Sequence, residues 1–268
     1  MASRNSVKGV VEAWRAKTGR RRSSALLTYL EAYFIPSQGH DSGLGYKRQD
    51  WQISLMDYRH ICTAGMVAHH DLLTAHEALE AGPESLSLRL VLMRHLMLEI
   101  ANVADLAAIA GALYKDNPEL GELQRPIRNG LEFFKYLRNV YVGHFVSDLT
   151  DKTFEWMPHM NALVGKSRKE DQMIVSWFAL ETAINTYADP ETGHKIFDSD
   201  TDLNYPPDQT RFFNFLGETA LGSIAYIARL IVVTRGSVDV PNLEEGLLEL
   251  SMIAGQTGFA VLTRKKKR

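Results

Sequence analysis

Residues 83–114, which read PESLSLRLVLMRHLMLEIANVADLAAIAGALY, decide the fold. Pro83-Glu84-Ser85 supplies a helix start. Downstream of it, His95, Glu99 and Asn102 follow the spacing i, i+4, i+7 and therefore share one face of a helix. The remaining faces are almost wholly Leu, Met, Ile, Val and Ala. The stretch therefore predicts one long apolar helix of a helical bundle, crossed by a single narrow polar stripe.

Long helices are predicted on both sides of this one. The preceding helix covers about residues 47–80 and ends at Ala81-Gly82-Pro83, where a C-cap glycine precedes a proline. The following helix runs from about Pro118 to His144, with a kink or restart at Pro126. Short connections between long helices imply antiparallel neighbours, so the expected fold class is all-α, an antiparallel helical bundle.

The second half of the chain predicts more helices and two irregular stretches. We expect an irregular or partly extended segment after Phe145 and a polar, Asp-rich loop over residues 191–208. The helices are expected over residues 169–187, 210–233 and about 241–255. The chain accordingly divides into a basic N-terminal helical segment and loop (1–46), the bundle (47–234), and a C-terminal helix with a basic tail (235–268). Whether the basic runs 15–22 and 264–268 contact nucleic acid or are solvated stays open.

Composition limits the class of protein. Thirty basic and 32 acidic residues give the 268-residue chain a formal charge of −2, so contact with nucleic acid must come from local patches. The single cysteine, Cys62, excludes a disulfide framework and a cysteine-rich zinc site. Met1–Val10 has no apolar signal-peptide core. Leu96–Leu113 and Thr219–Thr234 are too charged or too short for a spanning helix. These features predict a soluble cytoplasmic protein without membrane contact.

The candidate catalytic residues lie in residues 133–145, which read FFKYLRNVYVGHF. At about 100° per residue, Arg138, Tyr141 and His144 form one stripe on a helix, and Asn139 lies about 100° away from Arg138. We therefore expect Asn139 to position groups in the site, and Gly143 to let the helix end or a neighbour approach.

This set of side chains suits phosphoryl chemistry on RNA. Arg138 offers a planar, permanently charged fork for phosphate oxygens, and His144 can exchange a proton near neutral pH. RNA brings its own nucleophile, the 2′-OH, so no metal or other cofactor is needed. Because one histidine does not easily act as both base and acid, a symmetric homodimer with two facing copies is part of the hypothesis.

The spacing Arg138-Asn139-x4-His144 near the end of a bundle helix resembles the signature of HEPN domains. Phe134, Leu137 and Phe145 form the apolar frame of the match, and the resemblance in helical layout covers about residues 47–234. It implies an all-α, metal-independent endoribonuclease of the toxin or antiviral-effector type, with Arg138, Asn139 and His144 as catalytic residues at a dimer interface. It also implies restraint by an antitoxin-type partner or an activating stimulus.

Alternatives to this assignment remain. The polar stripe is either the solvent side of its helix, or it faces Arg138, where Glu99 and Asn102 would support the site together with Tyr141. A competing metal site would use the first long helix, which holds His60, His69, His70, His76, Asp57 and Asp71. The sole Glu-x-x-His, Glu191–His194, falls in a loop, so we expect no metal. From another class comes a non-catalytic helical interaction module in which Arg138 forms a surface ion pair and His144 caps a helix.

Overall fold

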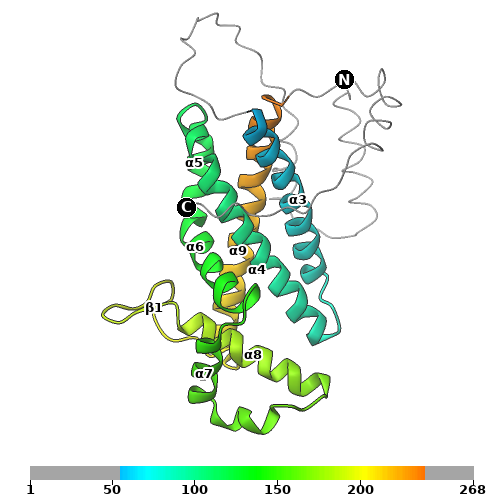
Figure 1. The fold of residues 1–268 in the computed structure, drawn as a ribbon, viewed down its shortest axis with the longest axis vertical. Coiled ribbons are helices and arrows are strands. Elements are labelled where there is room, and N and C mark those ends of the chain that lie inside the picture. The colour runs from blue at the N-terminus through cyan, green and yellow to red at the C-terminus, as the bar shows by residue number, and fades with distance from the viewer. Residues whose placement is uncertain (1–54, 239–268) are drawn as a thin grey trace, which may run out of the picture.

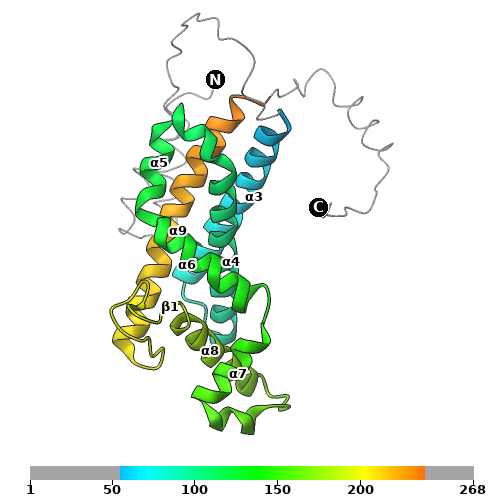
Figure 2. The ribbon, with the colours of Figure 1, turned by 60° about the vertical axis from the view of Figure 1, so that its left-hand side comes forward.

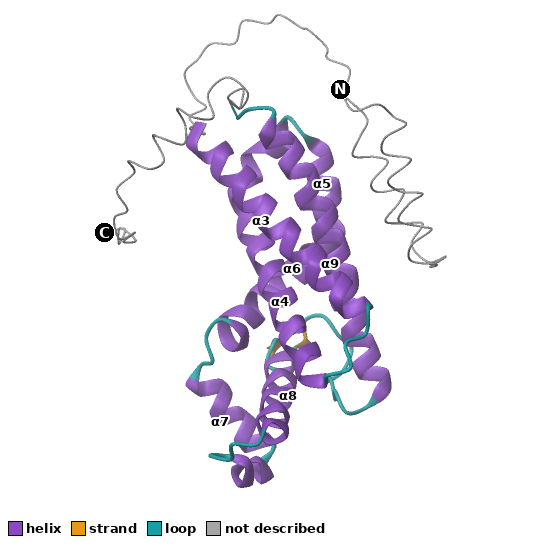
Figure 3. Cartoon of the chain, turned by 90° about the vertical axis from the view of Figure 1, so that its right-hand side faces the viewer, coloured by secondary structure: helices purple, strands orange, loops and turns teal. Residues whose placement is uncertain are grey.

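A computed structural model describes residues 55–238, and within this range the protein is all-α apart from one two-stranded hairpin. Three long helices run along the length of the molecule: α3 (Leu55–Glu80), α4 (Leu86–Ala110) and α9 (Pro206–Arg235). Figure 1 shows α3, α4 and α9 side by side, with α7 and α8 at one end of the bundle. Figure 3 shows how little of the described chain is strand. The predicted fold class is confirmed.

α4 is the central helix of the bundle, as its composition predicts. Ser85 caps it, because the Ser85 side chain accepts a hydrogen bond from the Leu88 amide at 3.3 Å. Met97, Ile100 and Val103 have no exposed surface and pack in one continuous core with residues of α3, α6 and α9. This burial supplies most of the driving force for the bundle.

The predicted helix from Pro118 to His144 is present in pieces. α5 (Pro118–Gln124) is followed by a 3₁₀ turn, η2 (Arg125–Ile127), and then by α6 (Arg128–Leu137). The break falls at Pro126, where proline has no amide hydrogen to donate to the helix ladder. Gly130 packs so closely on Thr219 of α9 that an added Cβ would lie 2.4 Å from the Thr219 hydroxyl oxygen.

The segment after Phe145 is helical, so the expectation of an irregular or extended stretch is wrong. It holds α7 (Ser147–Trp156) and the 3₁₀ helix η4 (Pro158–Leu163), followed by α8 (Lys169–Asn185). In α7, Leu149 and Thr153 share one buried face at i, i+4, and Asp148 stabilises the N-terminal turn. Figure 2 shows α7 and α8 together at the end of the bundle.

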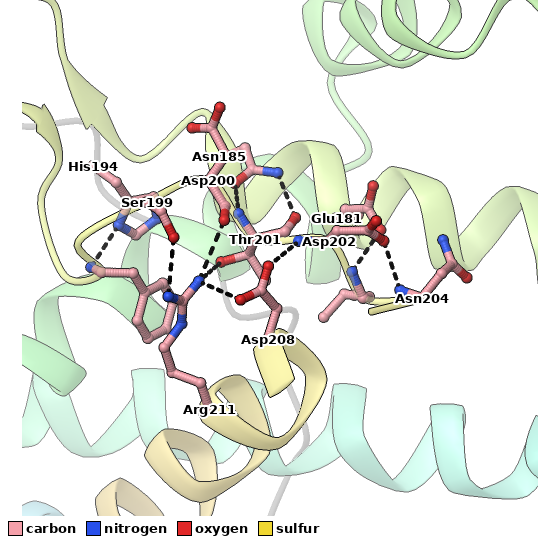
Figure 4. Close-up of polar contacts among 12 residues, drawn as sticks. Glu181, Asn185, His194, Ser199, Asp200, Thr201, Asp202, Asn204, Asp208 and Arg211 are labelled. Carbon is pink, nitrogen blue, oxygen red and sulfur yellow. Dashed lines mark hydrogen bonds and ion pairs between the residues drawn. The ribbon is translucent and has the colours of Figure 1, made fainter. Parts of the chain in front are cut away.

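The polar loop before α9 contains the hairpin of β1 (Ala188–Asp189) and β2 (Gly193–His194), which pair antiparallel. Figure 4 shows the side chains that hold this loop in place. Asn185 accepts from the Thr201 amide at 2.7 Å and donates to the Thr201 carbonyl at 2.8 Å. Glu181 accepts from the Leu203 amide at 2.8 Å, and Arg211 donates to the Ser199 hydroxyl at 3.0 Å. Side chains of α8 and α9 therefore fix the loop from both ends.

The predicted boundaries are tested only in part. The start of the first helix near residue 47, the N-terminal segment, the helix over about 241–255 and both basic runs lie outside the described residues. Two helical stretches, Leu86–Lys115 and Pro206–Arg235, are long and apolar enough to cross a membrane, with 56% and 50% of their most apolar windows buried inside the protein. The stretches Leu96–Leu113 and Thr219–Thr234, which are too charged or too short by themselves, are parts of these longer helices. Core helices of soluble proteins pass the same test, and the absence of membrane contact stays a prediction.

Candidate catalytic site at the end of α6

α6 ends in a single π-helical turn, η3 (Arg138–Val142), at the position of the candidate residues. The Gly143 amide donates to the Arg138 carbonyl at 2.8 Å, an i+5 bond, and the Val146 amide donates to the Val140 carbonyl at 3.2 Å. The helix is over before His144. Such π turns insert an extra residue into a helix and are frequent at functional sites.

The π turn changes the arrangement that an α-helical wheel predicts. Tyr141 is not on an open stripe, because only 1% of its surface is exposed. Its hydroxyl donates to the Ser176 carbonyl of α8 at 3.0 Å and lies 2.7 Å from the Ser176 hydroxyl. The Arg94 guanidinium lies 5.0 Å from the centre of the Tyr141 ring. Tyr141 therefore connects α4, η3 and α8, which contradicts the expected stripe of Arg138, Tyr141 and His144.

Arg138 is held by Asp105, an acidic residue of α4. Arg138 Nη1 lies 2.5 Å from Asp105 Oδ2, and Lys135 Nζ lies 2.7 Å from Asp105 Oδ1. Lys135 is three residues before Arg138 and therefore on the same side of α6. Asp105 and Lys135 were not among the predicted site residues. The i, i+3 spacing from Lys135 to Arg138 is a signal in the sequence by which Lys135 can be recognised as a neighbour of Arg138.

Lys135, Arg138 and Asp105 form a cluster with more positive than negative charge. Partial burial alone would raise the pKa of Asp105, but hydrogen bonds and charge from Lys135 and Arg138 outweigh burial and lower that pKa below its usual range. Asp105 is thus ionised at neutral pH, and the two cations and one anion sum to one net positive charge. Of the Arg138 side chain, 20% is exposed. The cluster can attract a phosphate, which would compete with Asp105 for the Arg138 guanidinium.

Asn139 and His144 are both exposed. The Asn139 side-chain oxygen accepts from Arg138 Nε at 3.4 Å. Gly143 packs on Arg138: an added Cβ would lie 3.1 Å from the Arg138 carbonyl oxygen and 3.5 Å from Arg138 Cγ. The turn therefore packs the backbone of Gly143, the residue before His144, against the arginine side chain.

Glu99 and Asn102 lie elsewhere on α4. Glu99 is 6% exposed, accepts from the Asn102 amide at 3.2 Å, and has its pKa raised chiefly by burial. Its interactions are with Asn102, His95 and Asp71, and within residues 55–238 none reaches Arg138 or His144. The expectation that Glu99 and Asn102 support the catalytic site is therefore wrong, and the alternative of a solvent-facing stripe fails as well because Glu99 is buried.

The other histidines differ in exposure and in hydrogen bonding. His194 has both ring nitrogens satisfied: Nε2 donates to the Ile184 carbonyl at 2.9 Å, and Nδ1 accepts from the Ile196 and Phe197 amides. Burial lowers the pKa of His194, which keeps this ring neutral. His60 and His70 are exposed on α3, and burial lowers the pKa of His69. The side chain of Asp57 lies outside the described residues.

Neither of two cavities among the described residues is lined by Arg138, Asn139 or His144. Cavities of about 470 Å³ beside α7 and α8, and of about 450 Å³ between α3, α4, α8 and α9, are lined by other residues. A long polymeric substrate does not need a deep pocket within one chain. No protein-family model matches the sequence, and no curated protein and no solved structure matches it significantly.

Proposed function

We propose that the protein is a metal-independent endoribonuclease of the HEPN type that acts as a homodimer, with Arg138, Asn139 and His144 of both chains at one shared site. The observation that carries the proposal is the π turn that begins at Arg138, because it ends the helix at Gly143 and leaves the next residue, His144, exposed. The all-α bundle supports it, because the resemblance implies this fold.

The reaction needs two proton transfers and one stabilised phosphate. His144 of one chain takes the proton of the 2′-OH as this oxygen attacks the adjacent phosphorus. The bond to the 5′ oxygen breaks, and His144 of the second chain protonates that oxygen. Arg138 stabilises the extra charge of the pentavalent phosphorus, while Asn139 holds the guanidinium. The products are a 2′,3′-cyclic phosphate and a 5′-hydroxyl.

The test is cleavage of single-stranded RNA by the purified full chain in excess EDTA. We expect cleavage to persist in chelator, and His144→Ala to lower kcat by about 10²–10⁴-fold because general acid–base catalysis contributes that much. Arg138→Ala should lower it by about 10²–10³-fold. His60→Ala is the matched control, since His60 is an exposed histidine on α3, a helix that bears none of the proposed residues.

Size-exclusion chromatography with light scattering on the same samples separates catalysis from assembly. The proposal requires that His144→Ala remain a dimer while it loses cleavage, and that the cleaved ends carry cyclic phosphate. RNA that stays intact with the wild-type protein, or cleavage that stops in EDTA, contradicts the proposal.

A second function has one observation in its favour. Asp105 already neutralises part of the Arg138 charge, as in an ordinary interhelical ion pair. On this basis the chain is a non-catalytic dimerisation module of the same fold, in which Arg138 and His144 have no action on RNA. The two functions differ in one result: the module forms the dimer but leaves RNA intact at all protein concentrations.

A further inference from the structure

A second cluster of chemically competent side chains lies between α3 and α4, apart from the proposed catalytic site. It consists of Asp71 on α3 and of His95 and Glu99 on α4, and each offers one ligand atom within 4.8 Å of the other two. His95 and Glu99 are at i, i+4 on one face of α4, and Asp71 faces them from the neighbouring helix. His95 Nε2 lies 3.9 Å from Asp71 Oδ2.

The second observation is that Glu99 has no permanent countercharge from an arginine or lysine among the described residues. The residue is 94% buried, since 6% of its surface is exposed. Among the described residues no arginine or lysine pairs with it, and its one hydrogen-bond donor, Asn102, serves only Oε2. The two ionisable side chains that face it are His95 and a second carboxylate, Asp71. A buried carboxylate beside a like charge is costly unless a cation compensates it.

We propose that Asp71, His95 and Glu99 bind a divalent first-row transition ion such as Zn²⁺, which joins α3 to α4. One imidazole nitrogen with two carboxylates is a ligand set for Zn²⁺ or Mn²⁺, whereas Ca²⁺ and Mg²⁺ prefer oxygen ligands alone. Bonds of about 2.0–2.2 Å place tetrahedral ligands about 3.4 Å apart, so small rotations of the two carboxylates complete the site.

The surroundings of the three ligands fit such an ion. Asn102 donates to Glu99 and orients the carboxylate, as outer partners of metal ligands commonly do. The side chains of Asp71 and His95 are 32% and 42% exposed, which leaves an entry path and a position for water. The site is independent of the proposed ribonuclease reaction, because Asp105, which holds Arg138, lies about 120° away from Glu99 around α4.

The experiment is calorimetric titration of ZnCl₂ into the chelator-treated full chain, with thermal unfolding in parallel. We expect one ion per chain and a rise in Tm. His95→Ala and Glu99→Gln should weaken binding by more than about a hundredfold, and Asn102→Ala by about 10–100-fold, as for outer partners. His60→Ala, an exposed histidine of α3, should bind as the wild type does.

Glu99→Gln separates loss of a ligand from loss of fold. The amide keeps the shape of the side chain and removes the buried charge, so the metal-free variant should be at least as stable as the wild type. It should nevertheless show no Tm rise with ZnCl₂. Absence of saturable binding at one ion per chain, or equal binding by wild type, His95→Ala and Glu99→Gln, overturns the proposal. Neither outcome bears on the proposed ribonuclease function, which is tested separately by RNA cleavage in EDTA.

Discussion

Arg138 of η3 and Asp105 of α4 form an ion pair across 33 residues of sequence, with Nη1 and Oδ2 2.5 Å apart. The pair orients the proposed catalytic arginine and at the same time competes with phosphate for it. Its contribution to stability is small, below about 1 kcal/mol, because 43% of the Asp105 side chain is exposed and solvent screens the attraction. The ion pair therefore matters more for the orientation of Arg138 than for the stability of the fold.

Asp105→Asn should change binding and turnover in opposite directions. The local charge rises from one to two net positive charges, so KM for RNA should fall about twofold to tenfold, since one more charge at a surface is worth on the order of 1 kcal/mol. Loss of the anchor for Arg138 should lower kcat at least about tenfold. Steady-state cleavage kinetics measure both, and an unchanged kcat would show that Asp105 does not position the arginine.

Gly143→Ala should disable the site while the bundle stays folded. The new Cβ would lie 3.1 Å from the Arg138 carbonyl oxygen, so the π turn must shift and Arg138 with it. We expect cleavage to fall at least about tenfold. Gly121→Ala in α5 is the matched control, because its Cβ meets only Tyr114 Cδ2 at 3.7 Å, an ordinary contact. Equal activity of the two variants would contradict the role of the turn.

Tyr141→Phe should affect stability and leave catalysis intact. The substitution removes the hydrogen bonds to Ser176 and should lower the free energy of unfolding by about 1 kcal/mol. Urea unfolding of Tyr141→Phe, Ser176→Ala and the double variant gives the coupling between them. A loss of kcat without a loss of stability would instead restore Tyr141 to the predicted positioning role.

Glu181→Gln should stabilise the protein more at neutral than at acid pH. Burial, ahead of the effects of Asp202 and Asp208, raises the pKa of Glu181 above its value in the unfolded chain. A carboxyl with a raised folded pKa contributes stability that is fully present below the unfolded pKa and is lost as pH rises through the folded one. Gln keeps an acceptor for the Leu203 amide without that loss. Urea unfolding of both proteins from pH 4 to 7 measures the difference, which should grow with pH.

The sequence predicts the helices of this bundle well, because their signals are local. Apolar periodicity, Gly82-Pro83 and Pro126 locate the end of α3, the start of α4 and the break before α6 within a few residues. α7 was missed because its ten residues carry only a short apolar face, Leu149 and Thr153, among many polar ones. A short helix of this kind depends on packing against its neighbours more than on its own pattern.

The candidate site is predictable in composition but not in geometry. Arg138 and His144 are recognisable from residue type and spacing, yet a wheel at 100° per residue assumes an α-helix, and the π turn invalidates it beyond Leu137. The wheel therefore assigned Tyr141 to the site, whereas the residue is buried against α8. The partners of Arg138 and Glu99 come from other helices, Asp105 on α4 and Asp71 on α3, and no local pattern specifies such contacts.

The most direct test of the shared site is RNA cleavage in EDTA by mixtures of wild-type protein and His144→Ala, co-refolded at constant total concentration. If both histidines of a dimer are needed, mixed dimers are inactive and activity follows the square of the wild-type fraction, so an equal mixture retains about a quarter of the activity. Activity proportional to the wild-type fraction, about one half in an equal mixture, would show that each chain acts alone and would contradict the composite site.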